Sequence, residues 1–411
     1  MALIVQKYGG TSVGDLDRIH KVAQRIQHYR EKGHDLIVVV SAMGRSTDEL
    51  IALARRVNPR PEPRELDLLT TTGEQQSAAL LALQLQALGL PARAFVQHQI
   101  GIATDGRYTN ARIVEVRPGK ILEAVRDGYV AVVGGFMGTT PEGELNTLGR
   151  GGSDTTAVAL AAAVGAHEAE IFTDTDGVFT TDPHRIPEAS KIDHIAYDPM
   201  IEMAALGAKV LHPRAVWYAK RYGVRLHVRS AFNFSKGTIV SEEAMKLDRP
   251  VTGVAIDEGQ AQIGLVGIPD RPGIASRVFE ALAERGIAVD MIIQGVPGHD
   301  ASRTQMAFTV PKDYAEDALE ALRALTAELG GEVTYNPAIA KVSIVGVALA
   351  STPGIPPRMF DAVARVGANI EMIATSEVRI SVIIPAEYAE AAAREIHRSF
   401  GLDRSEEGNG E

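Results

Sequence analysis

The chain has 411 residues, of which 45% are hydrophobic and 23% charged, with a formal net charge of −10 at pH 7 and no cysteine. This length exceeds what one hydrophobic core usually organises, so we expect two or three globular domains. The negative charge argues against nucleic acid or an anionic membrane surface as a partner, and the missing cysteines exclude disulfides and thiolate sites. No stretch reaches ~20 apolar residues and the first residues do not resemble a signal peptide, which predicts a cytoplasmic protein without a membrane anchor.

Residues 1–240 are predicted to alternate strands and helices. Apolar runs without polar alternation, such as Leu36–Ser41, are typical of strands covered on both faces. This order predicts the α/β class, with a mainly parallel sheet, helices on both faces and ligands at the carboxyl ends of the strands. The expected strands are 3–6, 36–41, 92–97, 129–134, 170–173, 224–229 and 238–240. The expected helices are 15–32, 48–57, 65–88, 120–126, 155–164, 200–206 and 213–221, with a hairpin at 104–116.

Two glycine-rich strings follow predicted strands and precede predicted helices: KYGGTS at 7–12 and LGRGGSDTT at 148–156. Glycine lets a ligand approach the backbone closely, and the free N–H groups at a helix start favour negative charge. Two such loops at one edge of a sheet can hold a polyphosphate from both sides. Lys7 adds a mobile positive charge, and Asp154 adds a carboxylate that can orient a metal or the reacting group.

The chain repeats itself after a charged segment at 241–250, which we take as a domain boundary. Matching residues stand 81 positions apart. The matched pairs are Pro272 and Pro353, Phe279 and Phe360, and Gly286 and Gly367. Beyond the loop at 297–303 the offset falls to 74, where Tyr314 matches Tyr388. A single change of offset, placed at a loop, indicates duplication of a small α+β unit.

Six strings together carry a resemblance to a known family: KYGGTS, SAMGRSTDEL, TTGEQQS, TLGRGGSDTTA, IFTDTDGVFTTDP and ALGAKVLHPRAV. The chain resembles, over nearly its whole length, the aspartokinases of the amino-acid kinase family, which carry two C-terminal ACT domains of ferredoxin-like α+β fold. The resemblance implies ATP- and Mg²⁺-dependent phosphorylation of L-aspartate to 4-phospho-L-aspartate, the first step toward lysine, threonine and methionine. It also implies a kinase domain at 1–245, ACT domains at 263–338 and at 250–262 plus 339–404, and a disordered tail at 405–411.

The resemblance assigns catalytic roles to Lys7 and Asp154. Phosphoryl transfer depends mainly on positioning and charge neutralisation, so Lys7 is expected to stabilise the transferred group and Asp154 to organise Lys7 and the phosphates. Capping of the following helix is an alternative role for Asp154. No direct protein cage for the metal is expected, because Mg²⁺ beside a nucleotide keeps several waters.

The implied substrate residues surround an amino acid that carries both signs of charge. Arg150 is expected to take the α-carboxylate as a bidentate fork, and Glu74 the ammonium. The aspartate-binding set is Ser41, Thr47, Glu74, Arg150, Gly151, Gly152 and Ser153. The ATP-binding set is Lys7, Tyr8, Gly9, Gly10, Thr173, Asp174, Phe179, His184, Arg185 and Lys209. His184 stands where relatives often have arginine, so either Arg185 substitutes or nucleotide affinity drops. His212 is expected to be structural.

The resemblance further implies feedback regulation at the ACT repeats by threonine, with lysine open as a second effector. The turn Asp270–Ala275 precedes a helix whose free N–H groups suit a carboxylate. Asp290 and Gln294 are expected to take the ammonium and hydroxyl of threonine. The implied effector set is Asp270, Gly273, Ala275, Asp290, Gln294, Ile355, Asn369, Ile370, Ser376 and Glu377. The alternative is that these residues only shape turns and strand edges.

Paired ACT units imply at least a dimer, either a homo-oligomer or an α2β2 assembly with an ACT-only subunit started internally at Met245. Two other functions stay open: a catalytically inactive amino-acid sensor, and a kinase for another small carboxylate. The presence of Lys7, Arg150 and Asp154 favours an active kinase over the sensor.

Overall fold

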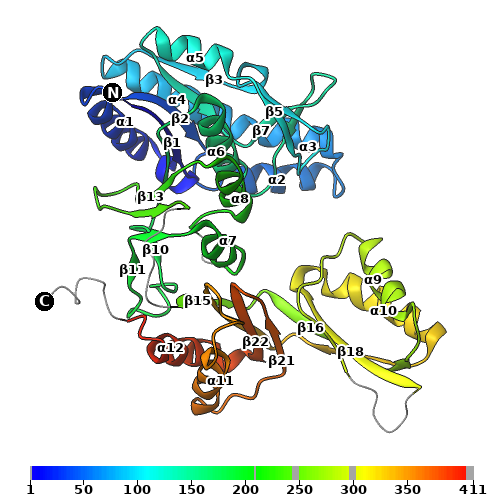
Figure 1. The fold of residues 1–411 in the computed structure, drawn as a ribbon. Coiled ribbons are helices and arrows are strands. Elements are labelled where there is room, and N and C mark those ends of the chain that lie inside the picture. The colour runs from blue at the N-terminus through cyan, green and yellow to red at the C-terminus, as the bar shows by residue number, and fades with distance from the viewer. Residues whose placement is uncertain (1, 208–209, 243–249, 296–301, 404–411) are drawn as a thin grey trace, which may run out of the picture. The chain divides into compact units, whose positions relative to one another are not determined.

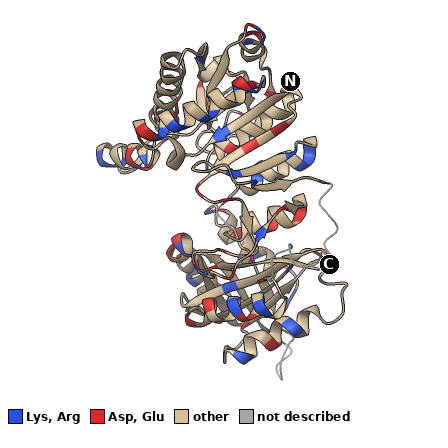
Figure 2. Cartoon of the chain, turned by 90° about the vertical axis from the view of Figure 1, so that its left-hand side faces the viewer, with Lys and Arg blue, Asp and Glu red and all other residues tan. Residues whose placement is uncertain are grey.

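The computed structural model describes residues 2–207, 210–242, 250–295 and 302–403 (Figure 1). Two compact units divide the chain, Met1–Phe179 with Lys191–Leu247 and Thr180–Ser190 with Asp248–Glu411. In both units acidic and basic residues are interspersed along the helices (Figure 2). Within the described ranges, no helix has the length and apolar character needed to cross a membrane.

The first unit is built on an eight-stranded sheet in the order β12-β14-β13-β9-β1-β2-β6-β3. Only the β13–β14 pair is antiparallel, which confirms the predicted mainly parallel α/β sheet. Its strands are β1 Leu3–Tyr8, β2 Asp35–Val40, β3 Ala92–Phe95, β6 Val130–Gly134, β9 Glu168–Thr173, β12 His194–Ile195, β13 Leu226–Ser230 and β14 Thr238–Val240. Strand β2 is fully buried from Leu36 to Val40, as its uninterrupted apolar run predicts.

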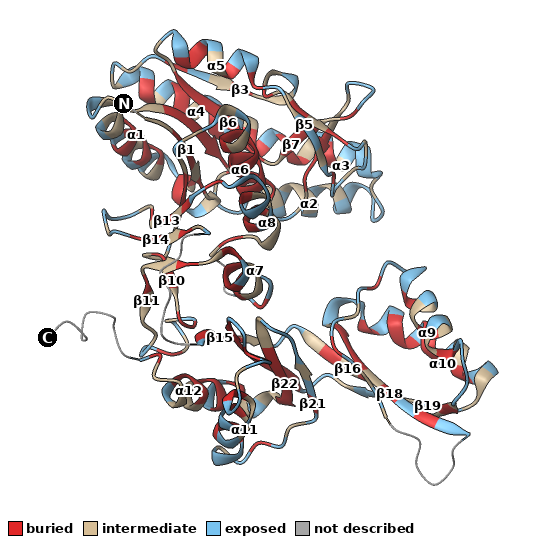
Figure 3. Cartoon of the chain, viewed as in Figure 1, coloured by how far each residue is buried: buried red, intermediate tan, exposed pale blue. Residues whose placement is uncertain are grey.

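Helices cover both faces of this sheet. Helices α1 and α4 pack on the face that carries Tyr8, and α6 contacts β1 on the other face (Figure 3). Helix α2, by contrast, has no buried residue. The helices of this unit are α1 Leu16–Glu31, α2 Ser46–Val57, α3 Pro63–Thr70, α4 Thr72–Ala87, α5 Gly119–Arg126, α6 Gly152–Val164, α7 Tyr197–Ala205 and α8 Pro213–Tyr222.

Two smaller sheets complete the first unit. The predicted hairpin at 104–116 is the antiparallel pair β4–β5, and it belongs to a sheet of order β5-β4-β7-β8. These strands are β4 Ile102–Thr104, β5 Ile113–Val116, β7 Met137–Thr139 and β8 Leu145–Thr147; a separate pair joins β10 Val178–Phe179 to β11 Lys191–Ile192. Strand β8 leads directly into the second glycine-rich loop.

The second unit contains two similar four-stranded sheets, each with two helices. Gly273 and Gly354, 81 residues apart, both have φ +92° and both precede a helix, as duplication requires. The first repeat holds β16 Gln260–Pro269, α9 Ile274–Ala283, β17 Ile292–Gln294, β18 Arg303–Pro311, α10 Ala315–Leu329 and β19 Glu332–Asn336. The second holds β15 Val251–Asp257, β20 Ile339–Gly346, α11 Ile355–Arg365, β21 Met372–Thr375, β22 Arg379–Pro385 and α12 Ala389–Ser399.

One segment departs from the predicted kinase range of 1–245. Thr180–Ser190 belongs to the second unit, where Ile186 is fully buried in the core of the second repeat. The Thr180 hydroxyl lies 2.8 Å from Nε2 of His397 in α12, and the Thr180 carbonyl accepts a hydrogen bond from the backbone of Val254. These contacts involve residues far apart in sequence, which local patterns do not reveal.

Candidate active site

Lys7 and Asp154, the two predicted catalytic residues, meet as an ion pair. Lys7 Nζ lies 2.7 Å from Asp154 Oδ1, and both side chains are mostly shielded from solvent. Successive side chains of a strand point to opposite faces, so Lys7 faces α6 while Tyr8 faces α1 and α4. The pair stands at the carboxyl end of β1, where a parallel sheet presents its ligands.

The first glycine-rich loop is pressed against the end of β2. A Cβ at Gly10 would lie 2.9 Å from the backbone oxygens of Ala42 and Gly44, so this position admits only glycine. A Cβ at Gly9 would lie 3.4 Å from Lys7 Nζ, which places the lysine ammonium directly over the loop. The loop backbone and the ammonium therefore form one positively polarised surface, suited to an anion.

The second loop turns into α6 on a left-handed glycine. Gly151 has φ +68° and occupies the N-cap, and a Cβ there would lie 2.1 Å from Cγ of His212. Helix α6 begins at Gly152, so Asp154 stands inside its first turn and makes no capping hydrogen bond. The alternative capping role predicted for Asp154 is therefore not realised. Ser153 and Asp154 are both buried.

His212 supports this turn. Its ring is half-buried against Gly151, and its Nδ1 accepts a hydrogen bond from the backbone N–H of Arg214 at the start of α8. Burial lowers the pKa of the His212 imidazole, although the Asp154 charge acts in the opposite direction. A neutral ring that accepts a backbone hydrogen bond and packs on the turn fits the structural role predicted for it.

Glu74 is a buried carboxylate with one oxygen left unpartnered. Only 3% of the residue is exposed. Its Oε1 accepts a hydrogen bond from the Ala42 backbone at 3.2 Å, whereas the buried Oε2 has no hydrogen-bond partner. Burial raises the pKa of the Glu74 carboxyl to about 7. A buried carboxylate with a free acceptor suits a cationic ligand group, because such a partner would offset its desolvation.

Three further residues predicted for the substrate follow β2 or β8 in the chain. Ser41 follows β2 directly, and its N–H donates to the Tyr8 carbonyl, while Thr47 lies in the first turn of α2. Arg150 is exposed between Gly149 and Gly151. Within the described residues its guanidinium makes no hydrogen bond or ion pair, so it is free to meet an anion.

The residues predicted for the nucleotide differ in how far their side chains are exposed. Thr173 is the last residue of β9, beside the end of β1, and Asp174 follows it; the Thr173 hydroxyl donates to Asp174 Oδ1 at 3.1 Å. Phe179, in β10, is only partly buried. Lys209 lies outside the described residues. Tyr8 requires a correction: its ring is fully buried and stacks on Phe172 at 4.6 Å, so its side chain is not available to a nucleotide.

His184 and Arg185 are the other two residues predicted for the nucleotide. Both belong to the segment Thr180–Ser190 of the second unit. Arg185 makes a two-point ion pair with Glu258, at 3.0 and 3.2 Å, and His184 is exposed. Arg185 is thus engaged by an acidic residue of its own unit.

Among the described residues, three closely spaced groups that could ligate a metal are Glu168, Glu170 and His227. They lie on β9 and β13, and Glu170 is fully buried and already bonded to Gln6, Tyr29 and Arg229. This cluster is therefore a structural network and does not adjoin the two glycine-rich loops. At those loops the single carboxylate of Asp154 fits an ion that is held mainly by phosphates and water.

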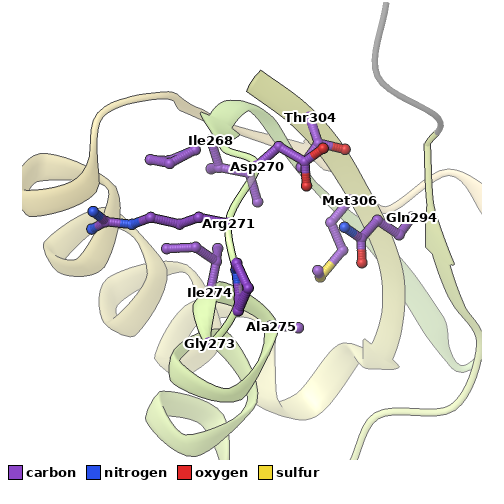
Figure 4. Close-up of a pocket in the computed structure, with 11 residues that line it drawn as sticks. Ile268, Asp270, Arg271, Gly273, Ile274, Ala275, Gln294, Thr304 and Met306 are labelled. Atoms are coloured by element: carbon purple, nitrogen blue, oxygen red, sulfur yellow. The ribbon is translucent and has the colours of Figure 1, made fainter. Parts of the chain in front are cut away.

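The first repeat contains a cavity of about 370 Å³ that brings together four of its five predicted effector residues (Figure 4). Asp270 and Gly273 come from the turn before α9, Ala275 from the first turn of α9, and Gln294 from the end of β17. Gly273 has φ +92° at the N-cap, which leaves the first N–H groups of α9 without a side-chain cap. The cavity combines a helix start, a carboxylate and an amide, a set suited to a small zwitterion.

Asp290 requires a correction. Asp290 does not line the cavity; it forms ion pairs with the buried Lys341 and with Arg379 of the second repeat. A carboxylate neutralised in this way is a poor site for the ammonium predicted there. In the second repeat Ile355 is buried and Ile370 packs on the core, whereas Asn369, Ser376 and Glu377 are exposed; Glu377 accepts a hydrogen bond from Ser351 at 2.7 Å.

Two charged residues that the sequence analysis did not single out form hydrogen bonds to the backbone just before the second glycine-rich loop. Asp67 in α3 accepts hydrogen bonds from Thr109 and Thr147, and Arg214 in α8 donates to the carbonyl of Leu148. Arg214 belongs to the string LHPRAV, which could have pointed to it as a functional residue. Asp67 had none, because its hydrogen-bond partners are mostly backbone groups.

Comparison with known proteins shows the family to which the chain belongs. The amino acid kinase family matches residues 2–230, and the ACT domain matches 263–325 and 342–400. An aspartokinase of Thermus thermophilus is 74% identical over 98% of this chain and 100% of its own length. Solved structures of Escherichia coli aspartokinase III are 26% identical and cover 97% of this chain and 99% of theirs. The complex with aspartate and ADP has a TM-score of 0.80, and that with lysine and aspartate 0.77. The chain therefore belongs to the amino acid kinase family and, within it, to the aspartokinases with C-terminal ACT domains.

Proposed function

We propose that this chain transfers the γ-phosphoryl group of ATP to the β-carboxylate of L-aspartate, which gives ADP and 4-phospho-L-aspartate. The observation that carries the proposal is the buried Glu74, whose Oε2 lacks a hydrogen-bond partner that a substrate ammonium would supply. The complex of E. coli aspartokinase III with aspartate and ADP supports the same pair of ligands. A pathway toward lysine, threonine and methionine follows from this product.

The proposed chemistry assigns each charged group one task. Arg150 binds the α-carboxylate and Glu74 the ammonium, which directs the β-carboxylate toward the phosphates. One carboxylate oxygen attacks the γ-phosphorus while the bond to the bridging oxygen breaks, and ADP leaves. Lys7 and the Gly9–Gly10 backbone stabilise the charge on the transferred group. Mg²⁺, held by the phosphates beside Asp154, would supply charge neutralisation. No general base is needed, since the attacking carboxylate is already ionised at pH 7.

A coupled assay of ADP release tests the function directly. The purified chain is supplied with ATP, Mg²⁺ and one of three acceptors: aspartate, glutamate or N-acetylglutamate. We expect ADP release with aspartate alone. Release with another acceptor in its place would favour a different carboxylate kinase, and no release with any of them would favour the amino-acid sensor.

Arg150→Lys is expected to raise the KM for aspartate roughly 10-fold or more while the KM for ATP changes little. Lysine keeps the charge but loses the planar fork that pairs with a carboxylate at two points. Steady-state kinetics with each substrate varied in turn measures both constants. An equal rise in both KM values would instead make Arg150 a phosphate ligand.

We also propose that the first-repeat cavity binds threonine as a feedback inhibitor, with lysine as a second effector to be tested. The cavity's helix start and its Asp270 and Gln294 side chains support a zwitterionic ligand. The complex of E. coli aspartokinase III with lysine supports regulation of this kind. Coupling between effector and substrate sites typically changes apparent affinity ~5–150-fold.

Titration of threonine, lysine and both together against ADP release measures the regulation. We expect threonine to inhibit the wild type and Asp270→Asn to lose inhibition with its basal rate intact. Asp313→Asn is the matched control, an exposed aspartate of the same repeat. If millimolar threonine leaves the wild-type rate unchanged, or if Asp270→Asn is inhibited as strongly as the wild type, this site assignment fails.

Assembly is proposed from the paired repeats. We expect at least a dimer, as a homo-oligomer or as an α2β2 assembly whose smaller subunit starts at Met245, a residue outside the described ranges. The strand edges of β17 and β21 carry the exposed apolar residues Ile292 and Ile373, which supports edge or face pairing between copies.

A further inference from the structure

Asp67 is a buried carboxylate that binds two separate backbone segments. It lies in α3 and is 1% exposed. Its Oδ2 accepts hydrogen bonds from the N–H groups of Thr109 at 2.8 Å and Thr147 at 2.9 Å, and its Oδ1 accepts the Thr147 hydroxyl at 2.8 Å. Burial raises the pKa of the Asp67 carboxyl, and these three hydrogen bonds act in the opposite direction. The carboxylate thus joins α3 to the loop before β5 and to the end of β8.

Arg214 donates hydrogen bonds to acceptor groups of the same two segments. From the first turn of α8, its Nη1 donates to the Leu148 carbonyl at 2.7 Å and to Asn110 Oδ1 at 3.3 Å. Its Nη2 donates to the Ala111 carbonyl. The segments also bond to each other, through the Ala111 N–H and the Thr147 carbonyl at 2.8 Å. The Asp67 carboxylate therefore accepts hydrogen bonds from N–H groups of these two paired segments, and the Arg214 guanidinium donates hydrogen bonds to their carbonyl groups.

This backbone pair leads directly into Arg150. Gly149 has φ +76°, and a Cβ there would lie 2.9 Å from Asn110 Oδ1, so the loop is packed against the held segment. Thr109 has φ +63°, an unfavourable conformation for a residue other than glycine. Such a conformation persists where the surroundings determine it strongly, as the Asp67 hydrogen bond to its N–H does here. Arg150, two residues beyond Leu148, has no partner of its own in the described structure.

We propose that Asp67 and Arg214 form a clamp that positions the Arg150 loop and so sets the enzyme's affinity for aspartate, whose α-carboxylate Arg150 binds. Neither residue would touch substrate; both act through the backbone of Thr147 and Leu148. This inference rests on the proposed phosphorylation of aspartate. It separates the roles of two arginines: Arg150 binds the acceptor, and Arg214 fixes where Arg150 stands.

The first test compares Arg214→Lys with Arg221→Lys, an exposed arginine of the same helix. Lysine at 214 keeps the charge but cannot reach the Leu148 and Ala111 carbonyls together. We expect a 10- to 100-fold rise in the KM for aspartate, about what a 1 Å misplacement costs, and less than a twofold change in the KM for ATP. Arg221→Lys should change neither. A proportional rise in both constants for Arg214→Lys would overturn the clamp.

A double-mutant cycle separates positioning from a general loss of structure. If Arg214 acts through Arg150, Arg214→Lys should change the KM for aspartate little in an Arg150→Lys background. Additive effects would overturn the proposal. Asp67→Asn replaces one carboxylate oxygen by an NH₂ group, which would face either the two backbone N–H groups or the Thr147 hydroxyl. Its effect on the KM for aspartate should therefore resemble that of Arg214→Lys. Glu65→Gln, on the same helix, is the control.

Hydrogen exchange gives a readout that does not depend on activity. Arg214→Lys should speed exchange of the amides of 149–152 in the full-length protein, while Arg221→Lys should leave them at the wild-type rate. Unchanged exchange in Arg214→Lys would overturn the clamp even if the kinetics moved. A wild type without aspartate-dependent ADP release, in contrast, would refute the proposed function and leave the exchange result to decide the clamp by itself.

Discussion

Lys7→Ala is expected to lower kcat by ~10²–10³ while the KM values for aspartate and ATP stay within a few-fold of the wild type. The Lys7 ammonium lies over the first glycine-rich loop, 2.7 Å from Asp154, where charge would develop on the transferred phosphoryl group. Removal of one such electrostatic group typically costs this factor, because its interaction is strongest in the transition state. Steady-state kinetics measures it, with Lys21→Ala, an exposed lysine of α1, as the control.

The change at Lys7 also leaves the Asp154 carboxylate without its partner, which destabilises the fold by itself. The double variant Lys7→Ala/Asp154→Ala removes both charges, so it should unfold at a higher temperature than Lys7→Ala and remain at least as inactive. Thermal unfolding and kinetics on the same samples distinguish the two effects. A near-normal kcat with only a raised KM would mean that Lys7 binds substrate without stabilising the transition state.

Glu74→Gln is expected to weaken aspartate binding and to stabilise the folded protein. The carboxylate is 3% exposed, with Oε2 lacking a partner. Loss of a charge-assisted hydrogen bond to the substrate ammonium typically costs ~1.5–3 kcal/mol, or roughly 10–150-fold in the KM for aspartate. Glutamine keeps the shape and removes the buried charge. Kinetics should therefore show a selective loss for aspartate, with the KM for ATP unchanged.

The stability gain should depend on pH in a defined direction. Burial raises the Glu74 pKa from an ordinary value of 4.5 to about 7 in the folded protein. The folded state therefore holds this proton more tightly than the unfolded chain, and stability falls as pH rises from 4.5 through 7. Above pH 7 the ionised Glu74 lowers the free energy of unfolding by about 3 kcal/mol, at 1.36 kcal/mol for each pH unit between the two pKa values.

Denaturant unfolding measures this penalty in the absence of substrate. Glu74→Gln should be more stable than the wild type at pH 8, and the difference should shrink toward pH 5. Glu49→Gln, an exposed glutamate of α2, should show no such trend. In the wild type, the KM for aspartate should rise as pH falls below 7, since the protonated carboxyl no longer attracts an ammonium. A stability difference that does not vary with pH would show that Glu74 is ionised normally in the folded state.

Local patterns in the sequence determined the architecture and the centre of the site. The uninterrupted apolar run of β2 indicated a strand buried on both faces, and it is one. The first glycine-rich string follows β1, so its place at the carboxyl end of that strand followed from the parallel topology, whereas the second string follows β8 of a smaller sheet. The offset of 81 between repeats likewise placed two left-handed glycines, Gly273 and Gly354, at equivalent helix starts. Each of these features depends on residues close together in the chain.

Tertiary packing decided which predicted side chains are free to act. Tyr8 and Lys7 are neighbours in one string, yet packing buries Tyr8 against Phe172 and leaves Lys7 with Asp154. Asp290 has a suitable position in its own repeat, but a lysine from the other repeat neutralises it. Arg185 is similarly taken by Glu258. The sequence shows which charged residues are present, but tertiary packing decides which of them are free to bind a ligand.

The clamp of Asp67 and Arg214 is the clearest case of a feature that only the tertiary structure reveals. Asp67 stands 80 residues from Thr147, and Arg214 stands 66 residues from Leu148. Their hydrogen-bond partners are mainly backbone N–H and C=O groups, which every residue carries and which therefore leave no mark in the sequence. The lysine beside the first glycine-rich loop can be identified from its local string, but the support of the loop that carries Arg150 depends on how three distant segments fold together.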